Sequence, residues 1–62
     1  MVSKVKSYVD EMATSYPKIK TEIYNIYELF LSEIEDESAS IQHEAVLCFS
    51  SIDELIAAHL ED

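Results

Sequence analysis

The sequence predicts an all-α protein, either a small three-helix bundle or a helical hairpin with an extra N-terminal helix. Three observations support this prediction. Apolar residues recur at intervals of three and four over most of the 62 residues, glycine is absent, and the single proline, Pro17, lies between two apolar stripes. We expect one helical domain over residues 1–62, with breaks near Pro17 and near residues 36–40.

The first predicted helix precedes Pro17 and carries a narrow apolar stripe. The members of this stripe step by three and four along the chain: Val2, Val5, Val9, Met12 and Tyr16. Proline disfavours the α conformation in the residue before it, so this helix should end there. Because proline suits the first turn of a helix, we expect Ser15 or Tyr16 to cap a second helix.

The second predicted helix runs from about Pro17 to about Glu37. On a helical projection, seven apolar residues fall within an arc of roughly 160°. They are Ile23, Tyr24, Ile26, Tyr27, Phe30, Leu31 and Ile34. So wide an arc is typical of the central helix of a bundle, which contacts two neighbours, and Leu29 lies outside it.

The break near residues 36–40 is predicted from charges and caps. Four acids gather at the end of the second segment: Glu33, Glu35, Asp36 and Glu37. Acids at a helix C-terminus oppose the helix dipole, whereas acids near an N-terminus are favourable. Ser38 and Ser40 follow as candidate N-caps. One long helix is the alternative, because neither glycine nor proline interrupts this region.

The third predicted helix runs from about Ser40 to about Leu60. Its apolar face comprises Ile41, Ala45, Cys48, Phe49, Ile52, Leu55, Ile56, His59 and Leu60, whereas Val46 and Leu47 lie off that face. Two local alternatives exist. Residues 45–49 resemble a short strand, and Ser51 with Glu54 matches a capping box that would restart the helix. We expect helix throughout, because a lone strand has no partner.

The composition excludes several classes of function. Without glycine the chain has no phosphate-binding loop or dinucleotide fingerprint, and without arginine it has no guanidinium clamp. The longest apolar run, residues 45–49, is far shorter than the roughly 20 residues that span a bilayer. A single cysteine cannot form an internal disulfide. We therefore expect a soluble, cytoplasmic protein with no membrane partner.

No catalytic, cofactor or metal site is expected. The acidic run lacks the glycine bend of calcium loops. Cys48 lies on the apolar stripe, where burial would raise the pKa of its thiol and leave it inert, and His59 is expected to be structural. His43 points to a different side of the helix from Glu44 and Cys48. The sequence therefore predicts a non-enzymatic protein.

Charge is distributed unevenly along the chain. Residues 1–20 carry four lysines and two acids, whereas residues 21–62 carry eleven acids and no lysine or arginine, for a total of −9. An acidic body is attracted to basic surfaces. We expect a protein partner with such a surface, bound through an acidic patch of Glu28, Glu33, Glu35, Asp36, Glu37 and Glu44. One form of this function is an inhibitor that mimics nucleic acid, as a small accessory or phage protein.

Self-association is the structural alternative. A core built from 62 residues is marginal, and neither a disulfide nor a metal supports it. Leu29, Val46 and Leu47, which fall off the predicted core faces, can form a patch that a homodimer would cover. Weak nucleic-acid contact is a third hypothesis, through the tyrosines and the lysines Lys4, Lys6, Lys18 and Lys20. It is disfavoured by the acidic body.

Overall fold

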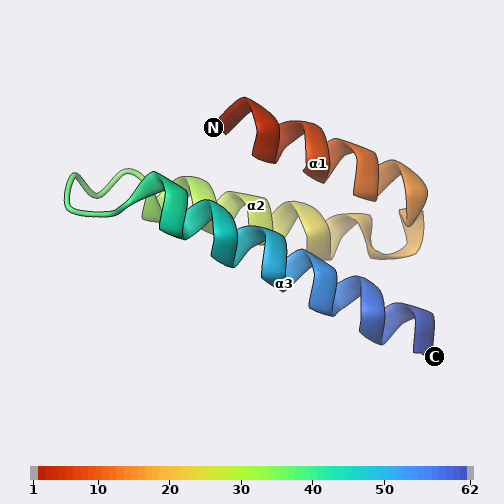
Figure 1. Ribbon diagram of the computed structural model, residues 1–62. Coiled ribbons are helices and arrows are strands. Elements are labelled where there is room, and N and C mark those ends of the chain that lie inside the picture. Colours follow the sequence, from red (N-terminus) through yellow and green to blue (C-terminus); the bar gives the residue numbers. More distant parts are fainter. Residues whose placement is uncertain (1, 62) are drawn as a thin grey trace.

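The computed structural model describes residues 2–61, which form a bundle of helices (Figure 1). This part of the chain contains helices α1 (Val2–Ser15), α2 (Lys20–Glu33) and α3 (Ile41–Glu61), with a 3-10 helix, η1 (Pro17–Ile19), before α2. It contains no strand, so the all-α prediction is confirmed. The domain predicted over residues 1–62 includes residues 1 and 62, which lie outside the described residues.

Helix α2 is the centre of the arrangement. It forms an antiparallel hairpin with α3, and α1 packs against both helices of that hairpin (Figure 1). Helices α1 and α3 run in the same direction, and α2 runs in the opposite one. The wide apolar arc of α2 therefore contacts two neighbours, as its sequence predicts.

The core is made of side chains from all three of these helices. Its buried members are Val5, Val9, Ala13, Ile23, Phe30, Ala45, Cys48, Ile52 and Ile56. Helix α1 contributes Val5, Val9 and Ala13, which are spaced four residues apart and share one face. The predicted stripe contained both valines. It contained Met12, which is only partly buried, and it did not contain Ala13, which is buried. A small residue fits where α1 approaches the hairpin closely.

The turn at Pro17 separates α1 from α2. Tyr16 has φ −128° and ψ 69°, outside the helical region, because the proline ring crowds the residue before it. The predicted start of the second helix at Pro17 is wrong in detail, since Pro17–Ile19 is a 3-10 turn and the α-helix begins at Lys20. Within the described chain, η1 has no side-chain cap at Tyr16, contrary to the expectation.

A turn over residues 34–40 joins α2 to α3. Helix α2 ends at Glu33, before the predicted end at Glu37, because Asp36 forms a local turn of its own. Its Oδ1 atom accepts hydrogen bonds from the backbone N–H of Ser38 at 2.9 Å and from the Ser38 hydroxyl at 2.8 Å. Ser40 then caps α3, accepting from the N–H of His43 at 3.2 Å. The single-helix alternative is therefore wrong.

Helix α3 is continuous from Ile41 to Glu61. The strand alternative for residues 45–49 and the restart at Ser51 are both wrong, because this segment packs Ala45 and Cys48 into the core as part of the helix. The predicted core face of the third helix is wrong at Ile41 and Leu60, because both side chains are exposed. Near the end of α3, the ring of His59 meets that of Tyr16 edge to face, with centroids 6.0 Å apart, whereas Leu60 beside it is 65% exposed.

Candidate functional site

Helix α1 is fixed to one side of the α2–α3 hairpin by polar contacts. Asp10 accepts a hydrogen bond from the hydroxyl of Tyr24 on α2 at 2.8 Å and pairs with Lys6 at 2.9 Å. Tyr8 donates its hydroxyl hydrogen to Asp53 on α3. The Tyr8 ring also meets Phe49 edge to face, with ring centroids 5.1 Å apart. These contacts join α1 to both helices of the hairpin.

The same contacts change the acidity of the groups that make them. The hydrogen bond from Lys6, followed by that from Tyr24, lowers the pKa of Asp10 below its ordinary value. The hydrogen bond to Asp53, with desolvation and the nearby negative charge, raises the pKa of Tyr8 to about 12. The Asp10 contact likewise raises the pKa of Tyr24. Each shift favours the protonation state that holds α1 in place, so the role of this network is structural.

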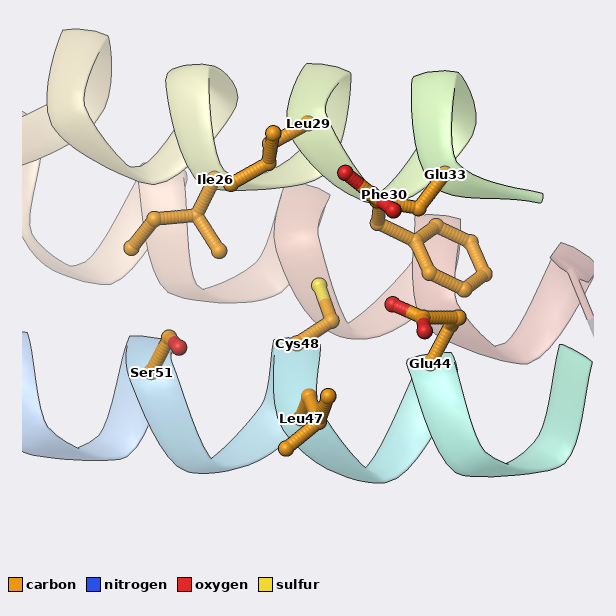
Figure 2. Close-up of a pocket in the computed structure, with 8 residues that line it drawn as sticks. All are labelled: Ile26, Leu29, Phe30, Glu33, Glu44, Leu47, Cys48 and Ser51. Carbon is orange, nitrogen blue, oxygen red and sulfur yellow. The ribbon is translucent and has the colours of Figure 1, made fainter. Parts of the chain in front are cut away.

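The opposite side of the hairpin carries a groove between α2 and α3, hereafter the α2–α3 groove (Figure 2). Ile26, Leu29, Phe30 and Glu33 line it from α2, and Glu44, Leu47, Cys48 and Ser51 line it from α3. These sets repeat at helical intervals of three and four, so each forms one face of its helix. The ribbon of α1 lies behind the groove in Figure 2.

The walls of the groove are apolar and exposed. Leu29 is 61% exposed and Leu47 is 47% exposed, whereas Phe30 and Cys48 beneath them are buried. The groove has a volume of about 400 Å³. Single exposed leucines are ordinary, but these two line one concave surface.

One end of the groove is acidic. Glu33 is the last lining residue of α2 and Glu44 is the first lining residue of α3, and both lie next to the turn that joins the two helices (Figure 2). The lining contains no basic residue, and no lysine or arginine follows Lys20 in the sequence. The groove therefore combines an apolar middle with a negative end, which favours an apolar segment that carries positive charge.

The structure assembles only part of the predicted acidic patch. Glu33 and Glu44 line the groove together, while Glu35, Asp36 and Glu37 belong to the turn beyond its acidic end. Glu28 is exposed on α2 and does not line the groove. Hydrogen bonds from Ser38 lower the pKa of Asp36, which keeps this turn negatively charged.

The predicted self-association residues also divide into two groups. Leu29 and Leu47 lie on opposite walls of the groove, whereas Val46 is 56% exposed and lies outside the lining. Sequence reasoning missed the contribution of Ile26 and Ser51 to the same surface. The antiparallel hairpin is the feature that could have indicated the groove. It brings Leu29, which lies off the core face of α2, opposite Leu47, which lies off the core face of α3.

The floor of the groove contains the single cysteine. Cys48 is 4% exposed, and burial raises the pKa of its thiol. The reactive thiolate is therefore disfavoured, which agrees with the expectation of a structural cysteine. Among residues 2–61, no group of three or more His, Cys, Asp or Glu side chains is placed to hold a metal ion.

Comparisons with known proteins give no relative on which to base a function. The chain matches no protein-family model, no curated protein and no solved structure. Within the described residues, no helix combines the length and apolar character needed to span a bilayer.

Proposed function

We propose that the protein is a non-enzymatic binding module whose α2–α3 groove holds a segment of another protein. That segment presents apolar residues flanked by lysine or arginine. The observation that carries the proposal is the placement of Leu29 and Leu47 on facing walls of a groove that ends at Glu33 and Glu44. The leucines supply apolar surface, and the glutamates select the sign of the partner's charge.

The two contributions have different physical roles. Burial of the groove leucines removes apolar surface from water, which stabilises a complex by roughly 25 cal/mol per Å². The total charge of −9 attracts a basic partner over longer distances and raises the association rate. Binding should therefore weaken with added salt, since salt screens the charges.

Inhibition is one form that this function takes. Eleven acids and no lysine or arginine after Lys20 give residues 21–62 a strongly negative charge. A partner whose basic surface ordinarily binds the phosphates of nucleic acid would be blocked by such a hairpin. The groove leucines would add affinity that phosphates do not provide.

Self-association through the same groove is the second candidate. It is favoured by the exposure of Leu29 and Leu47, which a second copy would cover. Charge opposes it, because each copy carries a net charge of −9. Nucleic-acid contact through the N-terminal lysines has less support, since Lys6 is already paired with Asp10.

Capture from cells that make the protein tests the proposal. The immobilised protein should retain a basic partner that is lost from the Leu29→Ser, Leu47→Ser double variant. The Val46→Ser variant is the matched control, because Val46 is equally apolar and exposed but lies outside the groove. Equal capture by all three proteins would contradict the proposal. Sedimentation equilibrium tests the second candidate, which requires a dimer that the double variant loses.

A further inference from the structure

We propose that the bound segment is an α-helix that lies parallel to α3, with its N-terminus and its basic residues at the Glu33–Glu44 end of the groove. This inference rests on the proposed function and adds the conformation, direction and charge order of the partner. It follows from the way α1 packs, from the helix dipole, and from where exposed apolar residues and lysines lie in this chain.

Helix α1 shows how the hairpin accepts a helix. On the other side of the hairpin, α1 packs Val5, Val9 and Ala13 between α2 and α3, and it runs in the same direction as α3 (Figure 1). Its first turns carry Lys4 and Lys6. A partner helix in the α2–α3 groove would have the same direction on the opposite face. The hairpin would then be covered on both sides, as in a four-helix bundle.

The helix dipole selects this direction. The N-terminus of a helix carries about half a positive charge and the C-terminus about half a negative charge. Glu33 and Glu44 lie together at one end of the groove, so they attract the N-terminus of a bound helix and repel its C-terminus. Lysine or arginine in the first turns of the partner would pair with the same two carboxylates.

The distribution of residues indicates that the partner is a different protein. Within residues 2–61, the large apolar residues that are exposed are Leu29, Ile41, Val46, Leu47 and Leu60, all of which belong to the acidic part of the chain. The lysines lie at or before Lys20, on α1, η1 and the start of α2, and their large apolar neighbours in sequence, Val5 and Ile19, are buried or partly buried. A second copy therefore offers exposed large apolar residues beside acids and not beside lysines. It does not offer the apolar and basic combination that the groove favours.

Two synthetic helical peptides test the direction. The first is about 14 residues long, close to four helical turns, with three leucines on one face, two lysines in its first turn, and alanine and glutamine elsewhere. The second has the same sequence written backwards, so its lysines lie in the last turn. Both are acetylated and amidated, so that terminal charges do not add to the dipole. Fluorescence anisotropy gives the dissociation constant of each peptide for the full chain.

The direction itself is read by photo-crosslinking. A benzophenone amino acid at the first position of the first peptide should attach to residues 34–44, next to Glu33 and Glu44. At the last position it should attach nearer Ile26 and Ser51, at the other end of the groove. Lysines in the last turn also stabilise the helix of the second peptide by themselves, so the ratio of the two dissociation constants is compared between the natural chain and the Glu33→Gln, Glu44→Gln double variant. We expect the ratio to favour the first peptide about tenfold more in the natural chain, because two carboxylates act on the dipole.

The outcomes separate the two proposals. A ratio of affinities that is unchanged in the Glu33→Gln, Glu44→Gln variant, or crosslinks in the reverse order, would contradict the direction while leaving the groove as the binding site. Absence of binding by both peptides would contradict the proposed function and this inference with it. The Glu33→Gln, Glu44→Gln double variant should remove the preference for the first peptide. The Glu28→Gln, Glu54→Gln variant, which changes two exposed acids outside the groove lining, should retain it.

Discussion

Leu29 of α2 and Leu47 of α3 lie on opposite walls of one groove, on the side of the hairpin that faces away from α1. Neither leucine contributes to the buried core, and both are close to half exposed or more. The fold is held together by the buried core and by the contacts of Tyr8 and Asp10 on the α1 side. Phe30 and Cys48 belong to both the core and the groove lining, but Leu29 and Leu47 do not, so binding can be tested separately from stability at these two leucines.

Core and groove substitutions should differ strongly in their effect on stability. Ile23 is fully buried, so Ile23→Ala should lower the free energy of unfolding by about 2–5 kcal/mol, from the lost burial and the cavity left behind. In a domain this small, that cost approaches the whole of its stability. Leu29→Ala, at an exposed position, should change the free energy by less than about 0.5 kcal/mol. Urea denaturation followed by circular dichroism measures both, and equal losses would contradict the assigned burial.

The Asp10 contacts predict a specific dependence of stability on pH. Because the folded state lowers the pKa of Asp10, its contribution is complete above the ordinary pKa of about 3.9 and is lost as pH falls through the lower folded value. The difference in melting temperature between the natural chain and Asp10→Asn should therefore shrink from about pH 7 to about pH 2. Glu11→Gln, an exposed acid on the same helix, is the control. A difference that does not vary with pH would contradict this role of Asp10.

Tyr8 should titrate above the ordinary range of tyrosine. Its folded pKa is raised to about 12, so its contribution to stability is present below about pH 10 and is lost as pH rises through the folded value. The pKa of Tyr24 is also raised, so ultraviolet absorbance should show late tyrosinate titration from both residues, and Tyr8→Phe should remove the part that belongs to Tyr8. The variant should also lose about 0.5–1.5 kcal/mol near neutral pH, the usual value of one hydrogen bond. Tyr27→Phe is the control, and a late transition whose amplitude is unchanged by Tyr8→Phe would contradict the assignment to Tyr8.

Ser40 should matter more for stability than serines inside α3. Its hydroxyl oxygen accepts from the N–H of His43, so Ser40→Ala should lower the free energy of unfolding by about 1 kcal/mol. Ser50 is exposed within α3, where alanine is the better helix former, so Ser50→Ala should leave stability unchanged or raise it slightly. Thermal denaturation compares the two variants. A greater loss from Ser50→Ala would show that Ser40 is not the cap.

Much of the fold could be predicted from local chemistry. The position of Pro17 and the caps near Ser40 indicate where the helices break, and the spacing of Val5 and Val9 identifies the buried face of α1. The exposure of Ile41 and Leu60 could not be predicted in this way. At Leu60 it depends on the rotation of α3 against its neighbours, since His59 packs against Tyr16 while Leu60 beside it is exposed, and this rotation is a property of the packed bundle.

The candidate site was only partly predictable for a similar reason. Sequence periodicity places Leu29 and Leu47 off the core faces but gives no rotation of one helix against the other. Packing decides that Glu33 and Glu44 meet beside these leucines, whereas Val46 and Glu28 point elsewhere. A patch defined by residue type alone therefore contains residues from more than one surface.

The central claim is that the α2–α3 groove binds a basic helix, and mapping of amide signals by nuclear magnetic resonance tests it most directly. On titration with the peptide that carries lysines in its first turn, the largest shifts should fall on Leu29, Glu44 and Leu47. Tyr8 and Asp53, on the α1 side, should change little, and added salt should weaken the response. Shifts concentrated around Tyr8 and Asp53, or no shifts at all, would contradict the account.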